Sequence, residues 1–233
     1  RKDWELRSSL CKHLPAVCTI VGRSATESFV VPCVETALID DEEMVVVNAL
    51  GCLTALVRMG LLTRAVLFGR NEVIGSGQKR GILDKYSSLL LHPFEDIRYS
   101  MCLLFATCSK TIRFPDNEVL LAPILRIFLR HDIDQDHLLN AESMMQALLS
   151  PSKYFESFDS IDFHVESSSN SEQIKERLQE YRNMKRTRKC FENKMEGFSY
   201  LHDHKIKSNM KGAYSIRVPN QKFAELITEP LPV

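Results

Sequence analysis

The sequence predicts an all-α protein built from repeated helical hairpins, and a recurring pattern is the main reason. An acidic residue or pair shortly precedes an apolar residue that opens a long helical apolar run, around Leu6, Val45 and Ile97. The spacings between these residues are 39 and 52, and a glycine-rich stretch of 13 residues at 69–81 accounts for the difference. A period near forty is typical of HEAT-type hairpins, so we expect an α-solenoid of about three to four hairpins.

Capping residues and helix breakers divide the apolar runs into individual helices. The helix expected at 42–59 is the clearest, because an aspartate pair precedes it, Gly60 ends it and apolar residues cover nearly its whole circumference. The stretch at 69–81 is expected to be a loop inserted within a later hairpin. Solenoid helices are expected at 3–21, 24 or 26 to 39, 42–59, 61–68, 82–91, 95–112, 117–130 and 135–149.

The chain changes character at Pro151, where the solenoid predicted for residues 1–150 ends. Residues 151–170 are rich in serine, phenylalanine and acidic residues and are predicted to form a linker. A charged helix with a thin apolar stripe is predicted at 171–196. An irregular, extended segment is predicted at 197–233, because helical periodicity fades there.

Composition restricts the possible functions. Of the 233 residues 44% are hydrophobic, which is enough for a packed core. Thirty basic and thirty acidic residues cancel, so the overall charge does not favour a nucleic acid partner. Seven cysteines without a CxxC pair, six of them inside apolar runs, indicate reduced core residues and a cytosolic setting. We find neither a signal peptide nor an uninterrupted apolar stretch of membrane-spanning length.

Catalytic, cofactor and metal sites are not expected. The segment 75–81 is glycine-rich but matches neither phosphate-loop pattern, and no predicted strand precedes it. An inserted loop is the favoured interpretation, although its Lys79–Arg80 pair could contact an acidic partner, and a nucleotide site is the enzymatic alternative. His202 and His204 lie near Cys190 but lack the second ligand pair of a zinc site.

Two sets of basic residues are candidates for contacts. Arg7 and Arg98 share one position of the repeat, and either form a row facing a ligand or pair with acidic neighbours along the stack; the second is favoured. Five cations within eight residues of the charged helix form either a solvated face or a contact with an acidic protein or anionic lipid surface. These five are Arg182, Lys185, Arg186, Arg188 and Lys189.

The repeated helices are expected to supply the structural core. Val45 and Val46 begin one apolar run, and Leu6 and Ile97 hold the equivalent positions before and after it. An exposed edge is expected near Arg1, because the first helix lacks a preceding partner. Core positions are expected at Leu6, Val46, Leu50, Leu53, Ile97, Met101 and Leu104.

Three segments resemble one known family in order and spacing. They are 4–9 (WELRSS), 41–50 (DEEMVVVNAL) with Leu53-Thr54 and Gly60-Leu61-Leu62 after it, and 91–99 (LHPFEDIRY), and the last is the most specific. The family is the regulatory subunit of the class III phosphatidylinositol 3-kinase complex, the vacuolar-protein-sorting pseudokinase scaffold. The resemblance covers about 1–150.

The resemblance implies a role and an architecture. Members carry an N-terminal serine/threonine kinase-like domain, a central HEAT solenoid and a C-terminal WD40 propeller. The chain would then be the solenoid and the segment leading to the propeller, within a larger protein. It would hold the lipid kinase catalytic subunit and a coiled-coil adaptor together, in the cytoplasm and peripherally on endosomal and autophagic membranes, for autophagy and vacuolar protein sorting.

This fragment is not expected to be an enzyme. It contains no H-R-D, no D-F-G and no ATP-binding lysine motif, so the kinase-like activity of the resembled family would lie elsewhere. The alternative function is a generic HEAT-repeat adaptor in membrane trafficking, unrelated to lipid kinases. The domains that flank this region would distinguish the two.

Overall fold

The structure, a computed structural model, describes residues 3–70, 79–112, 117–130, 140–149 and 172–190. The chain divides into two compact units after Arg186, and the elements below belong to the first, apart from the last turn of the helix at 172–190. The described elements are helical except for one pair of two-residue strands, which confirms the all-α prediction.

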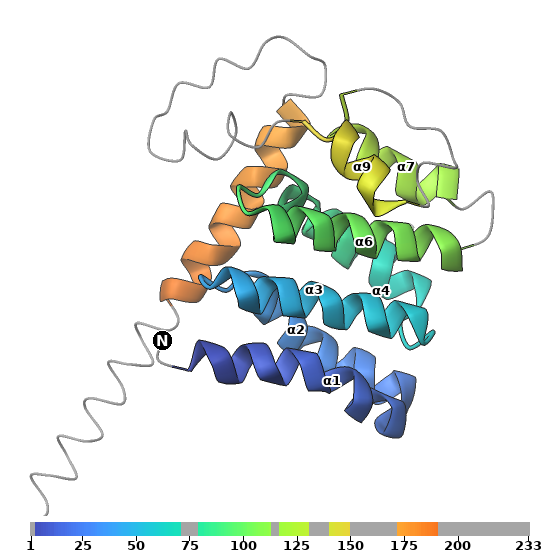
Figure 1. Ribbon diagram of the computed structural model, residues 1–233, viewed down its shortest axis with the longest axis vertical. Coiled ribbons are helices and arrows are strands. Elements are labelled where there is room, and N and C mark those ends of the chain that lie inside the picture. The colour runs from blue at the N-terminus through green and yellow to red at the C-terminus, as the bar shows by residue number, and fades with distance from the viewer. Residues whose placement is uncertain (1–2, 71–78, 113–116, 131–139, 150–171, 191–233) are drawn as a thin grey trace, which may run out of the picture. The chain divides into compact units, whose positions relative to one another are not determined.

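Four helices stack in chain order and form the first row of the solenoid (Figure 1). They are α1 (Trp4–Ala25), α3 (Glu43–Arg58), α6 (Glu95–Thr111) and α9 (Ala141–Ala147). The first packs on the second, the second on the third and the third on the fourth. Nearest-neighbour stacking of this kind is the defining arrangement of a solenoid.

Shorter helices connect the first row and form a second row. The expected helix at 82–91 is divided in two by Tyr86, which leaves helical geometry at φ −109° and buries its ring. The expected helix at 117–130 begins instead as a π turn, because Pro123 in the following turn has no N–H to donate. The elements are a π turn at Thr26–Val30, α2 (Val31–Leu38), α4 (Arg64–Phe68), α5 (Ile82–Lys85), a 3₁₀ turn at Ser87–Leu91, a π turn at Asn117–Leu121 and α7 (Ala122–Arg126).

Glycines end helices at two predicted positions. Gly22 has φ 78° and interrupts α1, and Gly60 has φ 67° two residues beyond α3. Positive φ strains a residue that carries a Cβ, so glycine is favoured there. Asp3 precedes α1 as expected, without a side-chain capping bond. Before α3, Asp40 Oδ1 accepts a hydrogen bond from the backbone N–H of Glu42 at 3.1 Å.

The insertion at 69–81 has a short β stem. Strand β1 (Gly69–Arg70) pairs antiparallel with β2 (Lys79–Arg80), with Gly69 opposite Arg80. Gly81 closes the stem: a Cβ there would collide with the backbone of Leu67, Phe68 and Gly69. The tip of the insertion, 71–78, lies outside the described residues, as do the candidate linker at 151–170 and the segment 197–233.

The core runs through all the stacked helices and contains most of the residues expected there. Val46, Leu50, Leu53, Ile97, Met101 and Leu104 are buried. Leu6 is the exception: its side chain is 70% exposed, so the expectation that it contributes to the core is wrong. The physical reason is that, among the described first-row helices, α1 has a neighbour on one side only, whereas α3 and α6 each lie between two neighbours.

One apolar stretch is longer than the sequence led us to expect. Trp4–Leu38 has the length and hydropathy of a membrane span. The positive φ of Gly22 interrupts this stretch, and Cys11, Cys18, Val34 and Leu38 lie in the solenoid core. The stretch therefore serves here as two helices of the solenoid.

A helix at 172–190, called the brace helix below, packs on the solenoid through the predicted apolar stripe. Ile174, Leu178 and Tyr181 of this helix belong to the same core cluster as the first-row helices. The expected helix extended to 196, and residues 191–196 lie outside the described part. The stripe is thin in sequence yet sufficient to cover solenoid side chains.

Candidate interaction surfaces

The sequence predicts no catalytic or metal site, and only some of the residues weighed for that prediction lie in the part of the chain that the structure describes. Within the described ranges no group of three or more His, Cys, Asp or Glu side chains is placed to hold a metal. His202 and His204 lie outside those ranges, as does most of the glycine-rich segment 75–81. Arg80, next to that segment, is engaged by carboxylates of the chain itself.

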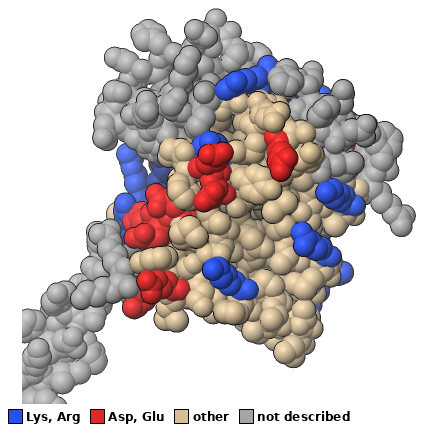
Figure 2. All heavy atoms as spheres, in the orientation of Figure 1, with Lys and Arg blue, Asp and Glu red and all other residues tan. Residues whose placement is uncertain are grey.

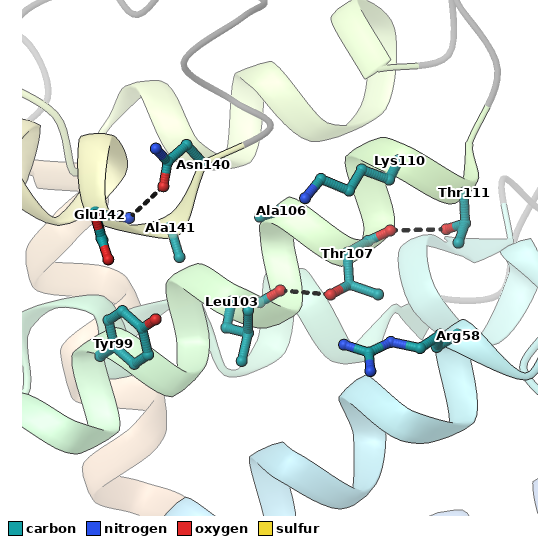
Figure 3. Close-up of a pocket in the computed structure, with 10 residues that line it drawn as sticks. All are labelled: Arg58, Tyr99, Leu103, Ala106, Thr107, Lys110, Thr111, Asn140, Ala141 and Glu142. Carbon is teal, nitrogen blue, oxygen red and sulfur yellow. Dashed lines mark hydrogen bonds between the residues drawn. The ribbon is translucent and has the colours of Figure 1, made fainter.

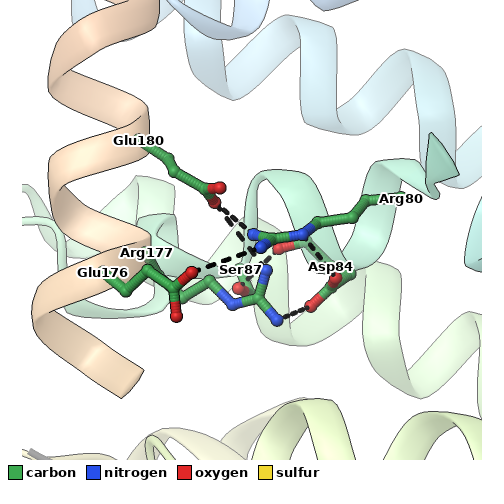
Figure 4. Close-up of polar contacts among 6 residues, drawn as sticks. All are labelled: Arg80, Asp84, Ser87, Glu176, Arg177 and Glu180. Atoms are coloured by element: carbon green, nitrogen blue, oxygen red, sulfur yellow. Dashed lines mark hydrogen bonds and ion pairs between the residues drawn. The ribbon is translucent and has the colours of Figure 1, made fainter. Parts of the chain in front are cut away.

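Arg80 lies among carboxylates from two elements (Figure 4). Its Nη2 is 3.4 Å from Glu176 Oε1, its Nη1 pairs with Glu180, and its Nε is 3.9 Å from Asp84 Oδ2. Arg177 of the brace helix reaches the other oxygen of the same aspartate, with Nη2 2.6 Å from Asp84 Oδ1. Charges of alternating sign therefore join the insertion stem, α5 and the brace helix.

Apolar burial anchors the brace helix more strongly than this ionic network. Ile174, Leu178 and Tyr181 are almost completely buried, and each such side chain contributes about 1.5–3 kcal/mol. The side chains of the ionic network are 19–61% exposed, and ion pairs that remain in contact with water contribute about 0–1 kcal/mol each. The Tyr181 hydroxyl also donates a hydrogen bond to the carbonyl of Leu38, at 3.1 Å, in a buried setting. The brace helix is thus fixed to the end of α2 as well as to α5.

The predicted basic contact residues lie in the second half of the brace helix. Lys185 Nζ is 4.0 Å from Asp41 Oδ1, in the turn before α3. Arg186 and Lys189 are exposed, whereas Arg182, Lys185 and Arg188 are partly buried. Contact of this set with a partner or an anionic surface stays a prediction.

The two arginines that share a repeat position make different contacts. Arg7 forms two hydrogen bonds with Asp40, from Nε at 2.9 Å and from Nη2 at 3.0 Å. Arg98 instead donates from Nη1 to the carbonyls of His92 and Pro93, both at 2.8 Å. The expected pairing with an acidic neighbour is therefore found for Arg7, while Arg98 satisfies backbone carbonyls of the preceding turn.

The exposed edge expected near the N-terminus is an apolar face of α1. Leu6 and Leu10 are 70% and 56% exposed. Shifting by the repeat spacings of 39 and 52 places fully buried residues of α3 and α6 at the same positions. The equivalent sets are Leu6, Val45 and Ile97, and Leu10, Ala49 and Met101. The α1 face therefore has the character of a helix-packing surface.

A groove of about 580 Å³ lies where α6 meets α9 and the end of α3 (Figure 3). Its lining combines apolar side chains of α6 and α9 with cations from the last turns of α3 and α6. Leu103, Ala106 and Ala141 supply the apolar part, and Arg58 and Lys110 are the cations.

On the face of the molecule shown in Figure 2, the sign of the charged side chains differs between the two ends of the first-row helices. Acidic side chains gather toward the N-terminal ends of the first-row helices and cationic ones toward the C-terminal ends (Figure 2). This arrangement complements the helix dipoles. Sequence reasoning missed Arg58 and Lys110, although a signal was present: they are 52 residues apart, the same spacing as between Val45 and Ile97.

Stacked hairpins with a brace helix packed on them define a helical-repeat protein of the α-solenoid class. The comparison with protein families agrees with this class. Residues 1–160 match the family model described as PIK3R4-like, middle domain. This chain belongs to the PIK3R4-like family and carries its middle domain, which confirms the resemblance drawn from the sequence.

Two relatives show how small a part of a larger protein this region corresponds to. A probable serine/threonine-protein kinase vps15 of Dictyostelium discoideum is 35% identical over 128 residues, which are 55% of this chain and 6% of that protein. A non-specific serine/threonine protein kinase of Candida glabrata is 23% identical over 133 residues, which are 57% of this chain and 9% of that protein. The chain spans less than a tenth of either relative.

Proposed function

We propose that this chain is the scaffold region of a regulatory subunit of a class III phosphatidylinositol 3-kinase complex that acts in autophagy and endosomal or vacuolar protein sorting. The observation that carries the proposal is the PIK3R4-like match across the whole solenoid. The region itself acts without catalysis, and any kinase activity belongs to another part of the parent protein.

The mechanism is geometric. Each first-row helix packs on the next, so partners bound to different hairpins are held at defined separations. The brace helix connects the α2–α3 turn with α5 and so restrains neighbouring hairpins against each other. The lipid kinase catalytic subunit and a coiled-coil adaptor are the proposed partners. The complex would lie in the cytoplasm, peripherally on endosomal and autophagic membranes.

Deletion in the full-length protein tests the proposal. Removing the solenoid, residues 1–150, should abolish copurification with the lipid kinase catalytic subunit and reduce phosphatidylinositol 3-phosphate production by the reconstituted complex. The matched control removes only 71–78, the tip of the insertion, and should leave both readouts unchanged. Normal assembly and lipid kinase output without 1–150 would contradict the proposal and favour a trafficking adaptor unrelated to lipid kinases.

A further inference from the structure

We propose that the groove between α6 and α9 binds an acidic segment of a partner protein that inserts one apolar side chain. The inference rests on the groove alone and does not depend on the identity of the larger complex. Three observations support the inference: the groove is concave, its floor is apolar, and the charged side chains at one end of it are cationic.

The groove has the size and lining of a peptide-anchoring site. Its volume of about 580 Å³ lies within the range of roughly 300–1,000 Å³ of ligand sites. Ala106 and Ala141 are small, buried residues at its floor, with Leu103 partly exposed beside them. The ring of Tyr99, 41% exposed, stands at one side. A partner leucine or phenylalanine side chain would cover this apolar surface.

The cationic end sets the charge of the partner. Arg58 and Lys110 lie on either side of Thr107 at the same end of the groove (Figure 3). Both are exposed, and within the described ranges neither forms an ion pair with a carboxylate. The C-terminal ends of α3 and α6 favour these two cations electrostatically, and both side chains stay accessible to a carboxylate of a partner.

The opposite end sets the direction of the partner. Glu142 lies there beside Asn140, whose Oδ1 accepts the backbone N–H of Glu142 at 3.0 Å (Figure 3). A carboxylate near Glu142 would be repelled, so the acidic residues of the partner belong at the end with Arg58 and Lys110. The groove therefore distinguishes between the two directions in which a peptide can lie.

An acidic protein segment fits better than a membrane or a nucleic acid. Each cation adds only a weak attraction to anionic lipid headgroups, so two cations are too few for stable attachment to a membrane. Thirty basic and thirty acidic residues cancel, so the overall charge does not favour a polyanion, and the groove lining holds two cations. The apolar floor of the groove favours a ligand that can bury an apolar side chain against it.

A fluorescent twelve-residue peptide, with Glu and Asp flanking a central Phe, tests the inference on the full-length protein. We expect saturable binding that weakens roughly tenfold in Arg58→Glu/Lys110→Glu, because two attractions become repulsions. Replacing the peptide's Phe by Ala, or its acids by Gln and Asn, should weaken binding by a similar factor. Raising the salt concentration should also weaken it.

The matched control is Lys12→Glu/Arg130→Glu, which changes the charge equally at exposed residues outside the groove lining. It should bind the peptide like the unchanged protein, and thermal unfolding should show both double variants folded. Absence of saturable binding, or equal weakening in the control, would overturn the proposal. The proposal would also be overturned if Arg58→Glu/Lys110→Glu bound the peptide normally but lost binding to vesicles that contain 30% phosphatidylserine.

Discussion

Arg7 and Asp40, 33 residues apart, form a two-bond ion pair that joins α1 to the turn before α3. The carboxylate is buried and also accepts the backbone N–H of Glu42. One side chain thus connects two hairpins and holds the start of the second in place. The position of Arg7 within the repeat alone did not reveal which carboxylate it would meet.

We predict that Arg7→Ala destabilises the fold by about 1–3 kcal/mol, because it leaves a buried carboxylate with fewer donors. Asp40→Asn should cost a comparable amount. The double variant should cost clearly less than the sum, which a double-mutant cycle in urea would measure. Additive losses would show that the two side chains do not act together. Lys12→Ala, exposed on the same helix, is the control with no expected effect.

Alanine substitutions at equivalent positions of the repeat should lower the free energy of unfolding by different amounts. Met101→Ala should destabilise by about 2–5 kcal/mol, since the side chain is fully buried in α6. Leu10→Ala at the same position of α1 should change stability by about 0.5 kcal/mol or less in this chain, because it is 56% exposed. Chemical denaturation of both variants measures the contrast. A large loss for Leu10→Ala would mean that a contact outside the described residues covers this face.

Replacing glycine by alanine should change the stability of the fold in opposite directions at two positions. Gly81→Ala places a Cβ against the backbone of Leu67, Phe68 and Gly69, so the insertion stem must open and stability should fall. Gly51→Ala lies in the middle of α3, where a Cβ meets nothing within 4 Å. That change should stabilise by about 0.5–1 kcal/mol, because alanine loses less backbone entropy in a helix. Thermal unfolding of the two variants provides the comparison, and equal signs would contradict it.

The brace helix should depend on its apolar stripe more than on its ions. Leu178→Ala should destabilise by about 2–5 kcal/mol, whereas Arg80→Ala should cost about 1 kcal/mol or less. Tyr181→Phe should cost about 0.5–1.5 kcal/mol for the lost hydrogen bond to Leu38. Hydrogen exchange of residues 172–186 would follow detachment directly. A larger effect of Arg80→Ala than of Leu178→Ala would refute this order.

His92 should make stability depend on pH. Burial lowers its pKa to about 4, with further lowering by Lys185 and Arg98 and an opposing effect of Glu43. Its Nδ1 accepts the backbone N–H of Phe94 at 3.1 Å, which requires the unprotonated ring nitrogen. The unfolded chain takes up the proton near pH 6.5, so stability should fall as pH drops from about 6.5 to about 4.

The variant His92→Ala isolates this effect. It should lose the part of the pH dependence that falls between about 6.5 and 4, while remaining less stable than the unchanged protein at pH 7. The unfolding midpoint measured across this range is the readout. An unchanged pH profile in the variant would assign the dependence to other groups.

Much of the fold followed from local sequence. The caps and glycines placed α3 and the break in α1 almost to the residue, because helix ends need particular φ angles and hydrogen-bond acceptors. Pro123 and Tyr86 were less predictable. The cost of a proline, or of a buried ring, in a short helix depends on what surrounds it.

The sequence by itself determined the repeat, its period and the family, because these depend on the order and spacing of residues along the chain. Only the tertiary structure decided that Leu6 is exposed while Val45 and Ile97 are buried, that Arg7 meets Asp40, and that Arg58 and Lys110 share one groove. The physical reason is that burial, ion pairing and concavity belong to pairs of elements. Residues that are equivalent in sequence differ when one of their helices has a neighbour on one side only.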